Sequence, residues 1–389
     1  MKKFLRWLKA EHLAELLIAI FAFRLLLFGV GLFVQNKVGE VDGNWKVHAQ
    51  HIDGGVRGQL EQVWETWDSP WYIQIAGSGY HDGGLPFTSR ERADVAFFPG
   101  YPMLMHALSA VTKLSLGMSG ILISWASTIG IVVFGYKLLL VRKVSKKTAR
   151  LTLLLLFAHP IGFIFGAVYT EALFLFLVLG ALYFWETNQL ALFWVLGFWA
   201  GLTRPVGILL AAPPAIQMLQ QHFWKQPIKQ WMAQGFSASG PLLGLAAYCV
   251  YLHHKTGYWD AFNRVEATYF ARHTSLLHVF HSLFIQPFAG PNWAYFAVFA
   301  WVTLLFLVIY RKKIGYDYLA WSLLMMFGPL ATQILGMPRY TTVIFPLSLA
   351  GAYFLKDKST AVRRVVIGLT LSAQIVLFIL WVMSAEILQ

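Results

Sequence analysis

Long apolar runs separated by short polar or basic segments dominate the chain, and the first of them covers about residues 13–34. A run of this length matches the roughly 20 residues that an α-helix needs to cross the hydrocarbon core of a bilayer. It is too long for the core of a signal peptide, and no small-residue cleavage pattern follows it. The pattern therefore predicts an uncleaved first membrane helix.

Comparable apolar runs recur along the whole chain, at about 118–141, 236–252, 293–310, 314–335, 341–355 and 365–384. From 151 to 216 the apolar signal is nearly continuous, but proline and polar residues interrupt it at 159–160, 170–171, 186–188 and 204–205. Such interruptions favour four short or bent crossings, because broken helices occur where backbone lines a cavity. We predict an all-α polytopic integral membrane protein, a single membrane domain over residues 1–389 with about eleven transmembrane helices.

Basic residues flank these runs unevenly, and an excess of Lys and Arg marks the cytoplasmic side. The basic residues before position 10 place the amino terminus in the cytoplasm, and the cluster at 142–150 should lie there too. The segment 35–96, with half of the chain's 18 acidic residues, then lies outside. If 97–116 crossed the membrane, the cluster at 142–150 would lie outside. We therefore predict that 35–116 forms an extracytoplasmic loop containing interfacial helices.

The composition agrees with a membrane protein: 58% of residues are hydrophobic, 13% are charged, and the mean hydropathy is +0.58. These values exclude an ordinary soluble domain. A net charge of +13 would suggest nucleic acid in a soluble chain. Here the cations lie in short loops between apolar runs, so we expect the bilayer and its anionic lipids as partners and no nucleic acid. The single Cys249 excludes a disulfide framework and a cysteine-rich metal site.

Four polar residues fall at the predicted extracytoplasmic ends of helices: Asp68, Glu171, Arg204 and Arg339. An arginine in an apolar stretch is costly and indicates a function, and its paired donors suit a phosphate. The alternative for both arginines is an internal ion pair with a carboxylate such as Glu171. Glu171 could equally orient an acceptor, hold an arginine, or serve as an acid at a helix amino terminus.

Asp68 is the best candidate for a general base, because it lies in a polar loop beside Trp67, Trp71 and Tyr72. A partly dehydrated carboxylate at a bilayer surface takes a proton from a hydroxyl more readily than a solvated one. The alternative is an aspartate that caps a helix. The neighbouring rings could stack on a sugar, or they could anchor the loop at the bilayer surface as aromatic residues commonly do.

The order of several short motifs resembles the PIG-V-like mannosyltransferases, which are GT-C glycosyltransferases and whose eukaryotic member adds the second mannose of the GPI anchor. The resemblance runs from about 67 to 340, and the family usually has histidine where this chain has Trp71. The motifs that carry it are Trp67-Asp68 with Tyr72, Phe97-Phe98-Pro99-Gly100-Tyr101-Pro102, Tyr169-Thr170-Glu171, Leu202-Thr203-Arg204-Pro205-Val206-Gly207 and Pro338-Arg339-Tyr340.

The resemblance implies a GT-C fold and an enzyme that moves a sugar, expected to be mannose, from a polyprenyl- or dolichyl-phosphate donor to a lipid or glycan hydroxyl with inversion. It implies that Asp68 is the catalytic base and that Arg204 and Arg339 stabilise the departing phosphate. The other expected substrate-binding residues are Glu171, Trp67, Trp71, Tyr72, Tyr169 and Tyr340. No cofactor is required; a divalent metal is compatible with the chemistry, but neither an Asp-x-Asp motif nor a metal-ligand spacing indicates one.

The competing interpretation is a flippase or transporter for a lipid-linked sugar, without transferase activity. Transporters often consist of two related halves with broken helices near the midplane. No internal repeat is evident here, which favours the transferase. Short loops and the lack of any Asn-x-Ser/Thr sequence favour a bacterial plasma membrane with the site facing outward; in a eukaryote the endoplasmic reticulum would be expected.

Overall fold

The computed structural model describes residues 2–38, 55–81, 86–222, 225, 227–272 and 274–383. Helices make up 82% of the structure, and these ranges contain no strand. The predicted all-α class is therefore confirmed. The predicted outer loop at 35–116 falls partly on residues 39–54 and 82–85, which lie outside the described residues, so several of its acidic residues do too.

Four helices are long and apolar enough to cross a membrane: α2 (Leu13–Val38), α6 (Leu116–Val141), α15 (Pro291–Ile314) and α19 (Thr360–Val382). The pair α11 (Ile228–Ala238) and α12 (Gly240–Thr256) would add a fifth span, bent by 42°. Each coincides with a predicted crossing, as expected of an integral membrane protein. The predicted count of about eleven is not confirmed, because much of the remaining apolar sequence forms shorter helices.

Between residues 146 and 220 the predicted interruptions are the observed helix ends. Residues 158–169 separate α7 (Lys146–Phe157) from α8 (Thr170–Glu186), and α9 (Leu190–Thr203) ends where the Arg204-Pro205 pair begins η3 (Pro205–Ala211). Proline lacks a backbone donor and disfavours a helical residue before it, so Pro160 and Pro205 end the continuous pattern. A further helix, α10 (Ala212–Gln220), completes this segment.

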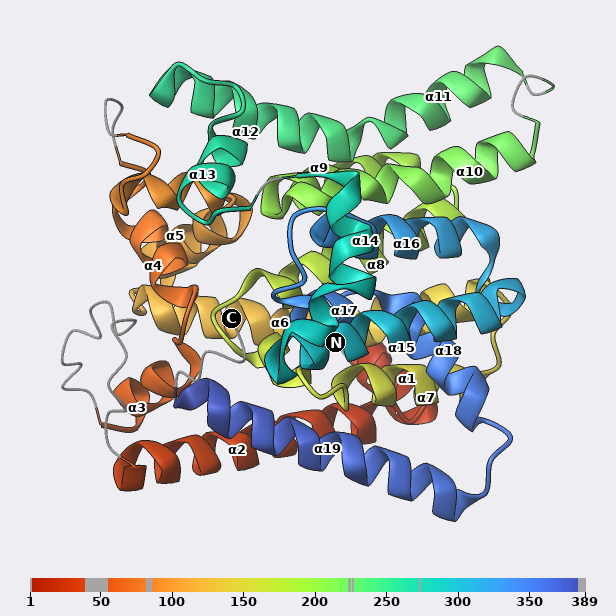
Figure 1. Cartoon of the computed structure of the whole chain (residues 1–389). Helices are drawn as coiled ribbons and strands as arrows, with labels where there is room; N and C mark the ends of the chain where they lie inside the picture. Colours follow the sequence, from red (N-terminus) through yellow and green to blue (C-terminus); the bar gives the residue numbers. More distant parts are fainter. Residues whose placement is uncertain are drawn as a thin grey trace.

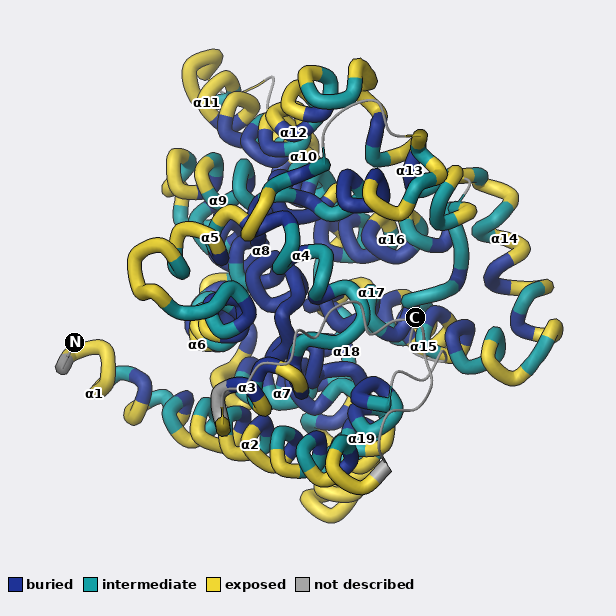
Figure 2. The backbone as a smooth tube through the Cα atoms, turned by 90° about the vertical axis from the view of Figure 1, so that its left-hand side faces the viewer, coloured by how far each residue is buried: buried dark blue, intermediate teal, exposed yellow. Residues whose placement is uncertain are grey.

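The first outer loop is itself helical where it is described, with α3 (Gly55–Trp64), α4 (Ser69–Ser78), η1 (Glu91–Ala96) and α5 (Gly100–Thr112). These helices gather with α13 (Ala261–Thr268) at the left of Figure 1 and face the viewer in Figure 2. At 1.5 Å per residue, α5 is about 20 Å long, which is too short to cross a hydrocarbon core of about 30 Å. Its place at the membrane surface stays a prediction.

Helix α8 forms the centre of the molecule, packed between α6 and α9, and Figure 2 shows its buried course. A helix that is apolar on nearly every side is stable when protein or lipid surrounds it, and α8 is buried in protein along most of its length. Ser124 of α6 donates to the carbonyl of Ala167, just before α8 begins, at 2.8 Å. At the other ends of the two helices, Arg142 contacts Glu186 at 2.7 Å. Thus α6 and α8 run in the same direction and define two ends of the molecule.

A buried polar network joins the helices at the end where α6 and α8 finish. The Arg142 guanidinium contacts Glu186 at 2.7 Å and both carboxylate oxygens of Asp317 at 2.7 and 2.9 Å. The side-chain amide of Gln217 donates to the same two carboxylates, and the Arg142 guanidinium lies 3.8 Å from the Tyr318 ring centroid. The network connects α6, α8 and α10 to α16 (Tyr316–Leu330).

The remaining α-helices of the described chain are α1 (Lys2–Ala10), α14 (Leu276–Phe284), α17 (Met337–Thr342) and α18 (Phe345–Leu355), and two short 3-10 helices are η2 (Gly162–Gly166) and η5 (Gln286–Ala289). Helices α2 and α19 pack side by side along one edge of the molecule, at the bottom of Figure 1. The buried side of α2 carries Arg24, whose guanidinium donates to Thr128 at 2.7 Å and to the carbonyl of Phe165 at 3.0 Å. This arginine faces protein rather than lipid.

Candidate active site

Asp68 occupies the N-cap position of α4, but its side chain makes no capping hydrogen bond. Its carboxylate Oδ2 instead accepts from Nη1 of Arg339 at 2.5 Å, across 271 positions of sequence. The side chain keeps 30% of its surface exposed. The helix-cap interpretation therefore does not describe this carboxylate, which is directed at an arginine from a distant helix.

The backbone around Asp68 is fixed by a buried tyrosine. Trp67 has a φ of +62°, a left-handed conformation that turns the chain into α4. The Tyr169 hydroxyl accepts from the Asp68 backbone N–H at 3.0 Å and donates to the Thr66 carbonyl at 3.1 Å. Since Tyr169 is only 1% exposed, its observed role is to hold this turn rather than to present a ring to a substrate.

Glu171 joins the two arginines. It is fully buried in the first turn of α8, and its Oε1 lies 2.8 Å from Nε of Arg339 and 2.5 Å from Nη1 of Arg204. Arg204 also donates to the Thr170 hydroxyl at 3.2 Å. The four residues that the predicted topology placed on one face thus form a continuous series of ion pairs, Asp68–Arg339–Glu171–Arg204.

Both arginines make the internal ion pair that was the alternative to phosphate binding. Two carboxylates and two guanidiniums balance in charge, but their exposure differs. Glu171 is 0% and Arg204 9% exposed at the side chain, whereas Asp68 and Arg339 keep 30% and 26%. The inner pair is enclosed by protein, and the outer pair is the part of this cluster that a ligand can reach.

Tyr340 lies against both arginines, with its ring centroid 5.8 Å from the Arg339 guanidinium and 6.0 Å from that of Arg204. The ring centroid of Tyr169 lies 5.2 Å from the Arg339 guanidinium. Guanidinium groups at these distances are attracted by the ring quadrupole. The two tyrosines therefore help to fix the guanidinium that Asp68 contacts.

The Trp71 and Tyr72 rings pack against the second aromatic motif. Trp71 stacks on Phe97 with ring centroids 5.4 Å apart, and Tyr72 meets Phe97 and Tyr101 edge-on at 5.4 and 5.6 Å. Tyr72 is 5% exposed. These contacts explain why the two motifs occur together: they dock α4, which Asp68 precedes, onto the start of α5.

One arginine near the site carries no sequence motif. Arg272, in the outer segment after α13, contacts Glu266 at 3.1 Å. Burial lowers the pKa of Arg272, but the nearby Tyr340, Glu266 and Asp68 outweigh burial and raise it. Arg272 is thus a third guanidinium in the field of Asp68. In the sequence, the one signal for this arginine is its position in a predicted outer loop, and many other residues share that signal.

Glu65, three residues before Asp68, is a partly buried acid on this side of the molecule. Burial raises the pKa of its carboxyl to about 8, and the nearby Glu61 adds to the shift. Glu61 accepts a hydrogen bond from Ser115, the N-cap residue of α6. Glu65 is therefore a group whose protonation changes near neutral pH.

Within the described ranges, no three His, Cys, Asp or Glu side chains are grouped so that they could hold a metal ion. The Asp68 cluster has two carboxylates, and each already contacts a guanidinium. The expectation that no cofactor is required, with a divalent metal compatible but not indicated, stays untested.

A family model described as Mannosyltransferase (PIG-V) matches residues 20–252, more than half of the chain. The matched region includes Asp68, Glu171 and Arg204, whereas Arg339 lies beyond it. No curated protein matches the chain.

Proposed function

Because the chain belongs to the PIG-V mannosyltransferase family, we propose that it moves mannose from a polyprenyl- or dolichyl-phosphate donor to an acceptor hydroxyl, with inversion. Family membership supports mannosyl transfer as the activity and an integral membrane protein as its setting. The proposal adds the lipid-phosphate donor, the stereochemistry, a GT-C fold, a lipid or glycan acceptor and a site on the extracytoplasmic face.

The observation that carries this proposal is the contact between a partly exposed carboxylate and a partly exposed guanidinium, Asp68 and Arg339, backed by the buried Glu171–Arg204 pair. A single displacement at the anomeric carbon needs a base for the attacking hydroxyl and positive charge for the leaving phosphate. Asp68 supplies the first and Arg339 the second.

In the proposed step, the acceptor hydroxyl loses its proton to a carboxylate oxygen of Asp68 as its oxygen bonds to the anomeric carbon. The bond from that carbon to the phosphate oxygen breaks, and the lipid phosphate leaves with the electron pair. Arg339 holds the negative charge that grows on this phosphate. A single displacement of this kind inverts the configuration at the anomeric carbon.

The ion pair between Asp68 and Arg339 describes the site without substrate. A phosphate competes well for a guanidinium, because its oxygens accept paired charge-assisted hydrogen bonds. When the donor phosphate binds Nη1 of Arg339, Asp68 loses its partner and becomes free to accept a proton. Glu171 holds the Nε side of the same guanidinium in place, and Arg204 offsets the charge that Glu171 would otherwise direct at the phosphate.

In this proposal Arg339 supplies the positive charge at the leaving phosphate once Asp68 has released it, and the step uses no cofactor. Transfer that persists in EDTA would agree with this, and loss of transfer that Mg²⁺ or Mn²⁺ restores would contradict it. The lipid tail of the donor would lie along the apolar helices, as expected for an integral membrane enzyme.

The decisive experiment compares purified wild-type protein with Asp68→Asn. Each is incubated with polyprenyl-phosphate-mannose and a membrane lipid extract as the acceptor source, and products are identified by mass spectrometry. We expect Asp68→Asn to remain folded and to lose at least about a thousandfold in transfer rate, since it removes the base from a preorganised site.

The matched control is Asp260→Asn, which changes an exposed aspartate that pairs only with Arg264 one helical turn away. It should transfer at the wild-type rate. Transfer by Asp68→Asn at a rate close to that of the control would remove Asp68 as the base. If Asp68→Asn instead lost movement of the donor lipid across the membrane and not mannosyl transfer, the result would support a transporter.

A further inference from the structure

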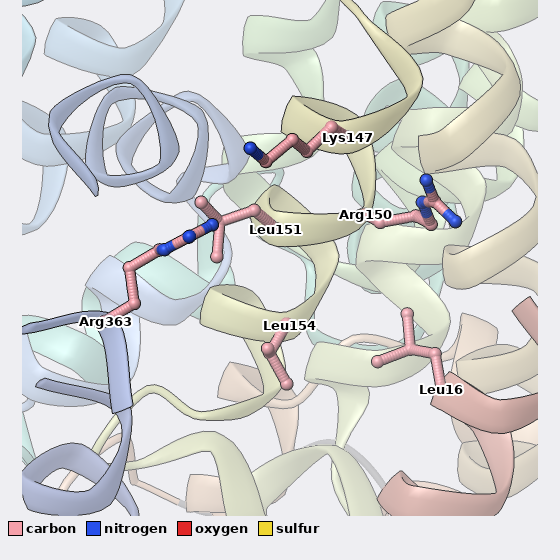
Figure 3. A pocket seen from close by; sticks show the side chains of 6 residues that line it. All are labelled: Leu16, Lys147, Arg150, Leu151, Leu154 and Arg363. Atoms are coloured by element: carbon pink, nitrogen blue, oxygen red, sulfur yellow. The ribbon is translucent and has the colours of Figure 1, made fainter. Parts of the chain in front are cut away.

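An open cavity lies far from the Asp68 cluster, where helices α2, α7 and α19 begin. Its volume is about 280 Å³. Leu16, Leu151 and Leu154 form its apolar wall, and three cations complete the lining: Lys147, Arg150 and Arg363. Figure 3 shows Arg363 extending from α19 towards Leu151 of α7, with Leu16 of α2 on the opposite side of the space.

The sequence positions of these residues place the cavity at the end opposite the candidate active site. Lys147 and Arg150 lie in the first turns of α7, directly after the end of α6 that carries Arg142. Arg363 lies in the first turn of α19. Three helices thus present their amino-terminal ends here, and the partial positive charge of such ends adds to that of the side chains. The distribution of basic residues assigns this end to the cytoplasm.

The three cations have no carboxylate partner among the residues that the structure describes. Glu11, an acid near Arg150, is already engaged by Lys146 at 2.7 Å and by the Tyr136 hydroxyl at 2.6 Å. Within the described part of the chain, the Arg363 side chain makes a single hydrogen bond, to the Thr360 hydroxyl at 3.3 Å, and its Nε is buried without a hydrogen-bond partner. A buried guanidinium donor in this condition is costly unless an anion completes its hydrogen bonds.

We propose that this cavity binds the phosphate headgroup of an anionic phospholipid. The cations match the phosphate charge, and the three leucines give the first part of an acyl chain an apolar surface. A free phosphate would satisfy the cations alone and would leave the leucines without an occupant. The site is separate from the proposed transfer chemistry and does not depend on it.

The test is native mass spectrometry of the full-length protein, released from mixed vesicles of phosphatidylglycerol and phosphatidylcholine. Wild-type protein should retain phosphatidylglycerol in preference to phosphatidylcholine. The triple variant that replaces the cavity cations should bind phosphatidylglycerol at least about tenfold more weakly. Its substitutions are Lys147→Gln, Arg150→Gln and Arg363→Gln.

A matched control removes the same charge from the same end of the molecule but outside the cavity. Its substitutions are Lys143→Gln, Lys358→Gln and Arg364→Gln, all at exposed residues. The control should retain phosphatidylglycerol like the wild type. Equal losses in both triple variants would show a general attraction of the basic end for anionic lipid and would overturn the cavity as the site.

The contribution of the apolar wall is tested separately with Leu154→Trp, which fills the cavity and leaves every charge in place. This variant should also bind phosphatidylglycerol about tenfold more weakly. Inorganic phosphate serves as the competitor in a second arm. If phosphate at the same concentration displaced the lipid from wild-type protein, or if Leu154→Trp bound the lipid normally, the lipid assignment would be wrong.

Discussion

Arg339 contacts two carboxylates with different nitrogens, Asp68 through Nη1 and Glu171 through Nε. Only a planar guanidinium can hold two acids in this way, because a lysine presents a single point charge on a flexible stem. Glu171 is enclosed and Asp68 is not, so the guanidinium is fixed on its inner side and exchangeable on its outer side. In the proposed mechanism, this asymmetry lets Glu171 hold Arg339 in position while the outer side of the guanidinium binds the donor phosphate.

This asymmetry predicts that Arg339→Lys leaves the protein folded but lowers kcat/KM for polyprenyl-phosphate-mannose by about 10²–10³-fold, as loss of a preorganised charge partner does. Steady-state kinetics on purified protein measures the effect. Arg264→Lys, at an exposed arginine that pairs with Asp260, is the control and should change little. Normal kinetics for Arg339→Lys would mean that the guanidinium shape is irrelevant to the donor.

The raised pKa of Glu65 leads to a prediction of how the free energy of unfolding depends on pH. Its pKa is raised by burial to about 8 in the folded protein, above the ordinary carboxyl value of 4.5. Between these two values the folded state binds more protons than the unfolded state, so the free energy of unfolding falls as pH rises. We expect the Tm of the wild type to drop by several degrees from pH 5 to pH 8.5.

The variant Glu65→Gln isolates this contribution, because the amide resembles the protonated carboxyl and does not titrate. Its Tm should fall less over the same pH range, and the difference from the wild type should be greatest at high pH. Thermal unfolding in detergent, followed by tryptophan fluorescence, gives both curves. Parallel curves for the two proteins would assign the pH dependence to other groups.

The sequence predicts which charged residues share a face and offers Glu171 as a partner for both arginines, but it does not predict the pair of Asp68 and Arg339. Asp68, Glu171, Arg204 and Arg339 each adjoin a helix end, and alternating cations order those ends along the chain. Pairing depends on how each helix is rotated and where its neighbours place their side chains, which periodicity in an apolar helix does not encode. Arg272 was missed for the same reason.

At the scale of helices, apolar length alone did not distinguish spans from short buried helices. The 26-residue α6 and the 17-residue α8 are both mostly apolar, yet α8 is almost entirely surrounded by protein. Breaks were predictable where proline or a polar pair interrupts the run, as at Pro160 and Pro205. The turn of Trp67 was not, since a positive φ in a tryptophan is imposed by the contacts of Tyr169 around it.

The polar network at the ends of α6, α8, α10 and α16 predicts a large effect of one substitution on stability. Arg142→Gln removes the cation between Glu186 and Asp317 and leaves two partly buried carboxylates facing each other. We expect a loss of about 3–5 kcal/mol in the free energy of unfolding, the usual cost of breaking a buried ion pair.

Thermal unfolding in detergent measures this loss, with Lys143→Gln as the control because the adjacent lysine is exposed. Mannosyl transfer at a temperature where both variants are folded should be nearly normal, since the network lies far from Asp68. A small change in Tm with a large loss of transfer would instead show that this network takes part in the reaction.

At the scale of the whole molecule, the charges divide the chain into two ends. Asp68 and its partners, the short helices of the first loop and α13 lie at one end, whereas the basic cavity and the Arg142 network lie at the other. The proposed chemistry needs the first end at the extracytoplasmic surface, and the proposed phospholipid site needs the second at the cytoplasmic leaflet. One orientation across the membrane must satisfy both.

Orientation can be tested because Cys249 is the chain's single cysteine and can be replaced by serine. Asp260→Cys then places a thiol at the Asp68 end and Lys358→Cys places one at the basic end, both at exposed positions. In intact cells, a membrane-impermeant maleimide should label the first and spare the second until the membrane is permeabilised. The reverse result would put Asp68 in the cytoplasm, and the base would then have to use a donor on that side. Labelling of both thiols in intact cells would mean that the two ends of the molecule do not lie on opposite sides of the bilayer.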